Sequence, residues 1–301
     1  MIWDTYIKDF GVFLKLEKSL SENSIEAYLH DVKKLKDFII LSNAGLKPEQ
    51  LDLEMLQNFL AYINELGIST STQSRIISGI KTFYKYLLLE DFIQTNPASM
   101  LEAPKLGRKL PVVLTIDEID KMVESVDLSK PGGQRNKAII ETLYGCGLRV
   151  SELVGLRISH LYFKDGYIRI IGKGNKERLV PIGRKAIKEI KLYRDFERKH
   201  LEVKKGEADF LFLNRRGSRL TRVMVFNIVK ALKSMAGISK EISPHTFRHS
   251  FASHLIEGGA DLRVVQEMLG HESILTTEIY THIDRTYLRE TVMQFHPRAG
   301  N

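Results

Sequence analysis

Six residues in the second half of the chain could together break and re-form a phosphodiester bond without a metal ion. They are Arg149, Lys173, His245, Arg248, His271 and Tyr280. Two guanidiniums can bind the nonbridging oxygens of a phosphate and offset the charge of the transition state. A lysine or histidine can protonate the departing sugar oxygen, and a histidine can take the proton of an attacking phenol. A tyrosine suits the nucleophile, because its phosphodiester keeps the energy of the broken bond and rejoining needs no ATP.

Each of these residues also has a simpler explanation when it is taken alone. Tyr280 could be a packed aromatic side chain, Arg149 could bridge to the preceding helix, and Lys173 could be a solvated turn residue. His245 and His249 have the spacing of some metal ligands, but the helix lacks the carboxylate and third ligand of an HExxH site. The sequence has neither a Walker motif nor an acidic metal cluster. The catalytic interpretation therefore depends on the whole set, and it needs no metal or other cofactor.

The segment SPHTFRHSFASHLIEGG at 243–259 predicts a helix with clear ends. Ser243 suits the N-cap, Pro244 the first helical position, and Gly258 or Gly259 the C-terminal stop. Helical spacing separates the basic side chains from the large apolar ones, with His245, Arg248 and His249 on one face and Phe247, Phe251 and Leu255 on the other. We expect the apolar face to pack and the basic face to be presented.

Three further local patterns position the other candidates. Arg149 lies in GCGLRVSELVGL, just before a predicted helix whose N-cap would be Ser151. In DLRVVQEMLGH, Asp261 and Gly270 predict a short helix, so that His271 follows a fixed helix exit. Residues 167–171 and 179–182 flank GKGNKER, which predicts a β-hairpin with Lys173 at its tip.

The composition favours a polyanionic partner. The 301 residues include 45 Lys and Arg against 37 Asp and Glu, which gives a net charge of +8 and an isoelectric point near 9.3. Nucleic acid is the leading partner of this kind, ahead of an anionic membrane surface. One cysteine, Cys146, excludes an internal disulfide framework and fits a reducing compartment, so we expect a cytoplasmic protein. No signal peptide and no transmembrane run is evident.

Helical periodicity and a proline-rich stretch divide the chain into two domains. Residues 1–100 contain four amphipathic segments, which predict a small four-helix bundle. Residues 101–113 hold proline, glycine and basic side chains without periodicity and predict a linker. Residues 114–301 then predict a mostly helical domain that contains the hairpin and all six candidate residues.

At these motifs the sequence resembles the tyrosine recombinase (phage integrase) family, and within it the Xer subfamily, whose XerD-type members it resembles most. GLRVSEL, GKGNKERLVPI, SPHTFRHSFASHL and LGHESILTTEIYTHI occur in the family's order and spacing. The resemblance spans nearly the whole chain. It implies a C-shaped clamp, with an N-terminal SAM-like four-helix bundle and a mostly helical catalytic domain that has a small antiparallel sheet.

The resemblance also assigns roles to the candidate residues. It implies that Arg149 and Arg248 bind the scissile phosphate, and that Tyr280 attacks it to form a 3'-phosphotyrosyl intermediate. Lys173 would act as general acid, and His245 and His271 would assist proton transfer. Glu152 matches a carboxylate that supports the site. In the N-terminal bundle, the helix at 70–87 would approach the major groove, with Ser74, Arg75 and Lys81 as DNA contacts.

Further expectations concern partners. The resemblance implies double-stranded DNA at a dif-like site, a tetramer with a related XerC-like recombinase, a FtsK-like translocase and no membrane. The helical segment with Tyr287, Leu288, Val292 and Phe295 would dock on a neighbouring protomer, or else pack on its own domain. A mobile-element or phage-type integrase, a type IB topoisomerase and a non-catalytic DNA-binding protein are the alternatives. The compact length argues against the integrase, and the full set of six residues against the DNA-binding protein.

Overall fold

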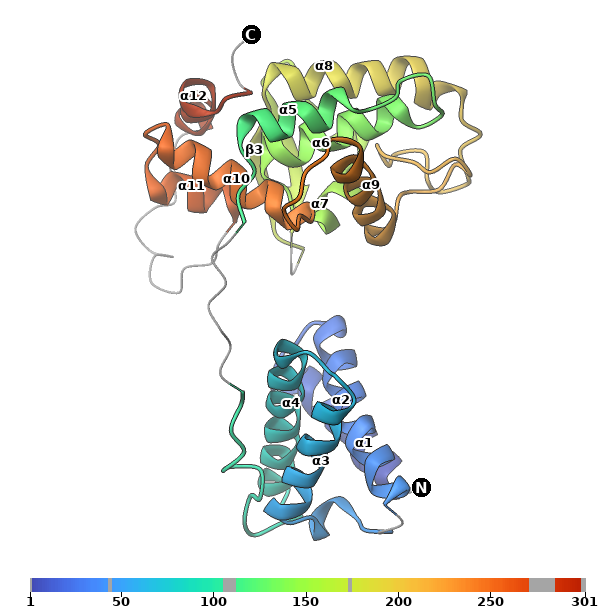
Figure 1. Ribbon diagram of the computed structural model, residues 1–301, viewed down its shortest axis with the longest axis vertical. Coiled ribbons are helices and arrows are strands. Elements are labelled where there is room, and N and C mark those ends of the chain that lie inside the picture. Colours follow the sequence, from blue (N-terminus) through green and yellow to red (C-terminus); the bar gives the residue numbers. More distant parts are fainter. Residues whose placement is uncertain (1, 43–44, 105–111, 173–174, 271–284, 299–301) are drawn as a thin grey trace. The chain divides into compact units, whose positions relative to one another are not determined.

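The chain forms two compact units, Met1–Lys109 and Leu110–Asn301, each with its own hydrophobic core (Figure 1). The computed structural model describes residues 2–42, 45–104, 112–172, 175–270 and 285–298. The predicted linker 101–113 extends beyond the described residues, so its bounds remain a prediction. Among the described residues, no helix is long and apolar enough to cross a bilayer.

The N-terminal unit is the predicted bundle of four helices. They are α1 (Ile2–Leu16), α2 (Glu22–Leu41), α3 (Leu53–Glu65) and α4 (Thr70–Leu89), with a single 3-10 turn at Pro48–Gln50 between α2 and α3. Asp52 fixes the start of α3, because its carboxylate accepts a hydrogen bond from the Met55 amide over 2.8 Å. Phe10 and Phe83 are fully buried, with ring centroids 5.2 Å apart, and they hold α1 against α4.

The second unit is mostly helical, as predicted. Its α-helices are α5 (Ile116–Glu124), α6 (Gly133–Cys146), α7 (Val150–Val154), α8 (Arg184–Leu192), α9 (Arg222–Met235), α10 (Pro244–Glu257), α11 (Leu262–Leu269) and α12 (Arg285–Phe295). Short 3-10 turns lie at Ile158–His160 and Arg198–His200, and a π-helical turn at Tyr193–Glu197 follows α8. Helix α6 is buried on every side from Ala138 to Cys146. A helix that is buried all round must lie within a core, and α8 and α10 both pack on it. The C-terminal end of α6 and the helix α10 that packs on it both contribute to the site described below.

A three-stranded antiparallel sheet completes this unit. Its strands are β1 (Leu161–Tyr162), β2 (Tyr167–Ile171) and β3 (Glu177–Pro181), in the order β1-β2-β3. The predicted hairpin is therefore confirmed, although its second strand begins two residues earlier than expected. Ile168 pairs with Val180 and Ile170 pairs with Arg178. Because side chains alternate across a strand, Arg178 shares the face of the buried Ile168, Ile170 and Val180.

The terminal helix α12 packs on its own unit. Leu288 is 7% exposed and Val292 is 1% exposed, and both belong to the core of the second unit. The helix contacts α10 and β3. Within this chain it therefore takes the alternative position, and its docking on a neighbouring protomer remains a prediction.

Two neighbouring glycines at the end of α6 should respond to alanine in opposite ways. Gly147 has φ +59°, and a Cβ there would lie 2.5 Å from Cδ1 of Phe251, so Gly147→Ala should lower the free energy of unfolding by about 2–4 kcal/mol. A Cβ at Gly145 would meet Ala186 at an ordinary 3.6 Å. Gly145→Ala, inside the helix, should raise the free energy of unfolding by about 0.5 kcal/mol. Urea unfolding of the full chain measures both, and equal effects would contradict the packing described.

Candidate active site

Arg149 is placed by the turn that joins α6 to α7. Helix α6 ends at Cys146, and Gly147 takes the left-handed conformation that stops it. Arg149 is itself the N-cap of α7, and its backbone amide donates to Oε2 of Glu152 over 2.8 Å. The predicted N-cap at Ser151 is therefore wrong by two residues. The sequence pattern favoured a serine, but the carboxylate of Glu152 reaches back to the free amide instead.

Helix α10 carries Arg248 and three histidines, His245, His249 and the buried His254. Ser243 is its N-cap, Pro244 its first residue and Gly258 its C-cap, as predicted. His245 and His249 are exposed, but Arg248 is only 6% exposed. The expectation that all three side chains are presented on one open face is therefore wrong for Arg248. Its guanidinium is drawn inward by carbonyl oxygens at the ends of two other helices.

These carbonyl oxygens belong to Gly147 and Leu269. Nη1 of Arg248 donates to the Gly147 oxygen over 2.9 Å, and Nη2 donates to the Leu269 oxygen over 2.5 Å. Carbonyls at a helix C-terminus lack partners within the helix and carry the negative end of its dipole. A guanidinium supplies the missing hydrogen-bond donors and a positive charge, which explains how the charged side chain of Arg248 is accommodated in a buried position.

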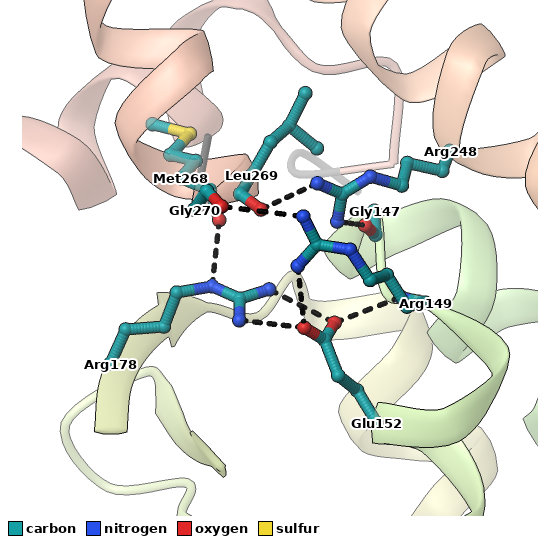
Figure 2. Close-up of polar contacts among 8 residues, drawn as sticks. All are labelled: Gly147, Arg149, Glu152, Arg178, Arg248, Met268, Leu269 and Gly270. Atoms are coloured by element: carbon teal, nitrogen blue, oxygen red, sulfur yellow. Dashed lines mark hydrogen bonds and ion pairs between the residues drawn. The ribbon is translucent and has the colours of Figure 1, made fainter. Parts of the chain in front are cut away.

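Helix α11 begins and ends as predicted, and its last carbonyls lie at the site. The Asp261 carboxylate accepts hydrogen bonds from the amides of Arg263 and Val264, and Gly270 ends the helix at φ +64°. Three consecutive carbonyls then each bind a different guanidinium (Figure 2). Met268 binds Arg178, Leu269 binds Arg248 and Gly270 binds Arg149, over 3.1, 2.5 and 3.3 Å.

Glu152 lies beneath these arginines, and its side chain is only 2% exposed. Oε1 accepts from Nη1 of Arg149 over 2.9 Å and from Nη1 of Arg178 over 2.8 Å. Oε2 accepts from Nη2 of Arg178 over 3.0 Å. Burial by itself would raise the pKa of Glu152, but the hydrogen bonds and charge of Arg178, with hydrogen bonds from Arg149, lower it below the usual value of 4.5. The carboxylate is therefore ionised at neutral pH.

The site carries more positive than negative charge. Glu152 is the one carboxylate bound to Arg149 and Arg178 among the described contacts, and Arg248 has none. Burial, followed by the charge of Arg149, lowers the pKa of Arg248 to about 10, so it stays protonated at neutral pH. Three guanidiniums around one carboxylate form a site that an anion such as a phosphate would stabilise.

Three of the predicted catalytic residues, Lys173, His271 and Tyr280, lie outside the described residues. The described residues end directly before two of them, Lys173 and His271. Gly172 precedes Lys173, and a Cβ built on it would lie 3.8 Å from Oε1 of Glu152. Gly270 precedes His271, and its carbonyl binds Arg149. The structure thus brings together Arg149, Arg248 and Glu152, while His245 lies exposed in the first turn of α10.

The predicted DNA contacts of the N-terminal unit lie on α4. Nη1 of Arg75 binds Oδ2 of the buried Asp31 over 2.5 Å and the carbonyl of Ala27 over 3.3 Å. The Ser74 hydroxyl donates to the Thr70 carbonyl one turn earlier, and Lys81 is half-buried. Arg75 therefore has a structural partner within its own unit, and the DNA contacts of all three remain predictions.

Arg178 is the functional candidate that the sequence reasoning missed. It lies within GKGNKERLVPI, where it looked like one more basic residue of a hairpin tip. Strand alternation could have found it, since it is two residues from Val180 and so shares the inward face. Within the described residues, no cluster of three or more His, Cys, Asp or Glu side chains could hold a metal ion.

Comparison with protein-family models identifies both units. The model of the phage integrase family matches residues 112–286, and that of the phage integrase N-terminal SAM-like domain matches residues 7–91. Tyrosine recombinase XerD of Chlorobaculum tepidum is 45% identical over 300 residues, which cover 99% of this chain and 98% of that protein. Tyrosine recombinase XerD of Listeria innocua is 42% identical, with 97% and 99% covered.

Solved structures agree with this result. The fold is similar to a crystal structure of the XerH site-specific recombinase bound to palindromic difH substrate in a post-cleavage complex, at 29% identity and a TM-score of 0.69. The match covers 89% of this chain and 79% of that one. A lambda integrase (75–356) dimer bound to a COC' core site shares the fold at 17% identity, with a TM-score of 0.70 and 94% and 100% covered.

Replacing Glu152 by glutamine should test the charge balance of the site. Glu152→Gln leaves Arg149 and Arg178 without their shared anion, so the free energy of unfolding at neutral pH should fall by about 3 kcal/mol. Because the pKa of Glu152 is lowered in the folded state, its stabilising contribution is present above 4.5 and is lost as the pH falls through the folded value. The difference between wild type and variant should therefore shrink in acid.

Glu177→Gln is the matched control. Glu177 lies on β3 with its side chain 52% exposed, and it pairs with Arg169 at 3.6 Å. Its replacement should change the free energy of unfolding by less than about 0.5 kcal/mol. Urea unfolding at neutral and acidic pH compares the two variants. A Glu152→Gln effect that is as small as the control, or that does not vary with pH, would show that the carboxylate is not held as an ion.

Proposed function

The chain belongs to the phage integrase family of tyrosine recombinases, and on this basis we propose that it cuts and rejoins DNA at a specific site through a phosphotyrosyl intermediate. One observation carries the proposal: Arg149 and Arg248 reach consecutive carbonyls of α11 from two different helices, so that both guanidiniums border one site (Figure 2). Two converging guanidiniums suit the two nonbridging oxygens of a phosphodiester.

The proposed reaction exchanges one phosphodiester for another. Tyr280 attacks the scissile phosphorus, the bond to the 5' sugar oxygen breaks, and a 3'-phosphotyrosyl bond forms. The phenol proton passes to a histidine, for which His245 and His271 are the candidates, while Lys173 protonates the departing oxygen. Arg149 and Arg248 offset the charge that develops on the equatorial oxygens. Attack by a 5' hydroxyl on the phosphotyrosine reverses these steps and joins the new strand.

The role of Glu152 in this proposal is to orient Arg149. The carboxylate binds both the backbone amide and Nη1 of Arg149, which fixes the side chain at the start of α7. A fixed guanidinium loses little conformational freedom when a phosphate binds, and its donors already point at the place where charge develops. The reaction as proposed uses no metal or other cofactor.

The biological setting that we propose is the resolution of chromosome dimers at a dif-like site in the cytoplasm. The chain would act in a tetramer on double-stranded DNA, with a related XerC-like recombinase and under a FtsK-like translocase. Support comes from the relatives named XerD at 40–45% identity over nearly the whole chain, and from the similarity to XerH bound to difH substrate. The net charge of +8 suits a partner whose phosphates supply affinity.

Replacing the nucleophile should prevent covalent capture and leave DNA binding intact. On a nicked duplex that traps the cleaved strand, wild type should form an adduct that resists SDS, and Tyr280→Phe should form none, because phenylalanine lacks the attacking oxygen. Tyr162→Phe is the control, since Tyr162 is 40% exposed on β1 and should leave adduct formation unchanged. Gel electrophoresis and peptide mass spectrometry measure the outcome. An adduct that persists in Tyr280→Phe would assign the nucleophile to another residue.

Recombination of a plasmid distinguishes the proposed setting from its alternatives. A supercoiled plasmid with two directly repeated dif-like sites should be resolved into two circles when the chain and an XerC-like partner are both present. A plasmid without the sites should keep its supercoils. Relaxation of that second plasmid by the chain alone would indicate a topoisomerase, and binding without any strand cleavage would indicate a non-catalytic protein.

A further inference from the structure

Arg178 is the third guanidinium of the site, and the proposed chemistry gives it no part. It projects from β3 on the inward face of the hairpin, opposite Ile170, and its side chain is 18% exposed. An arginine on a core-facing strand position costs desolvation unless its donors find acceptors. What it binds therefore indicates what it does.

All three nitrogen atoms of its guanidinium have partners (Figure 2). Nη1 and Nη2 bind the two oxygens of Glu152 over 2.8 and 3.0 Å, and Nε binds the Met268 carbonyl over 3.1 Å. The edge that could grip a phosphate bidentately is thus taken by a carboxylate. Arg149 and Arg248 differ, because neither gives both Nη atoms to one carboxylate and, among the described contacts, the Nε of each carries no hydrogen bond. Arg178 is placed to hold other groups of the site, and not to hold the phosphate.

The groups that it holds come from separate elements. Through Glu152 it reaches the start of α7, and through Met268 it reaches the last turn of α11. The end of β2 also lies next to the ion pair of Arg178 and Glu152, because a Cβ on Gly172 would lie 3.6 Å from Nη1 of Arg178. Without Arg178, the buried Glu152 would keep only Arg149 as an ionic partner, and the hairpin would lose its bond to α11.

We infer that Arg178 is a positioning residue, which keeps Glu152 charged so that the carboxylate fixes Arg149, and which ties the hairpin to the exit of α11. The inference rests on the proposed function and deepens it, since it concerns the same site and the same reaction. Arg149 would then be held in place by the ion pair between Arg178 on β3 and Glu152 on α7, two residues that lie 26 positions apart in the sequence.

A charge-dependent role has a pH signature. The charged groups that face Glu152 are Arg149 from α7, Arg178 from β3 and, more distantly, Arg248 from α10, while α11 contributes backbone carbonyls. Burial raises the pKa of Glu152, and Arg178 makes the largest contribution that lowers it. Loss of Arg178 should therefore raise that pKa. As a result, Arg149 should lose its anionic partner at a higher pH, and the acid limb of the cleavage profile should move upward.

Arg178→Met in the full chain tests the inference. Adduct formation on the nicked duplex is followed in a single turnover across a range of pH, and DNA affinity is measured by gel shift. We expect cleavage at neutral pH to slow by about 100-fold, the acid limb to rise by about one pH unit, and the dissociation constant to change by less than about threefold. Arg178→Lys keeps the charge without the bidentate geometry. Its cleavage rate at neutral pH should fall by about 10-fold, and its pH profile should match that of wild type.

Arg169→Met is the matched control on the same hairpin. Arg169 precedes Ile170 on β2, so its side chain lies on the opposite face from Arg178, where it pairs with Glu177 at 3.6 Å. Its replacement should leave both the rate and the pH profile unchanged. If Arg178→Met folds poorly, the double variant Glu152→Gln/Arg178→Lys replaces it, and it should be no slower than Glu152→Gln alone, because both changes act through one carboxylate.

Four results would overturn the inference. Slower cleavage with an unshifted acid limb would make Arg178 a stabilising residue only. A loss of DNA affinity that matches the loss of cleavage would make it a phosphate contact. Additive losses of cleavage rate in the double variant would show that Arg178 does not act through Glu152. An adduct in wild type together with wild-type behaviour of Arg178→Met contradicts this inference alone, whereas absence of any adduct in wild type contradicts the proposed function itself.

Discussion

The carboxylate of Glu152 is an ionised group in a place that solvent scarcely reaches, with a side chain 2% exposed. Such a charge is tolerated only when it is paired and hydrogen-bonded. Arg149 and Arg178 meet this condition from the start of α7 and from β3. The elements that would bind the phosphate and carry the hairpin tip are thus held by one buried group.

The exit of α11 extends this arrangement to the third arginine. The carbonyls of Met268, Leu269 and Gly270 each accept from a different guanidinium, so the end of one helix aligns side chains from α7, β3 and α10. Helix termini supply such acceptors at no cost to the helix, because these carbonyls have no partner within it. The excess positive charge that results is what makes the site suited to a phosphate.

Local patterns predicted most of the fold. Ser243 with Pro244, and Asp261 with Gly270, gave the bounds of α10 and α11, because capping depends on neighbours in sequence. The burial of Arg248 and the role of Arg178 were not predictable in this way. Both depend on acceptors that other elements bring: Gly147 from the end of α6, Leu269 from α11 and Glu152 from α7. Periodicity assigns a side chain to a face, but it does not say what covers that face.

A crystal structure of the covalent complex on a nicked duplex tests most directly whether Arg149 and Arg248 share the scissile phosphate. We expect a phosphate bound to Tyr280, with nitrogen atoms of both guanidiniums about 3 Å from its nonbridging oxygens. We also expect Arg178 to remain on Glu152 and Met268. A phosphate that contacts neither arginine, or that has displaced Glu152 from Arg178, would show that the two arginines do not form the phosphate site.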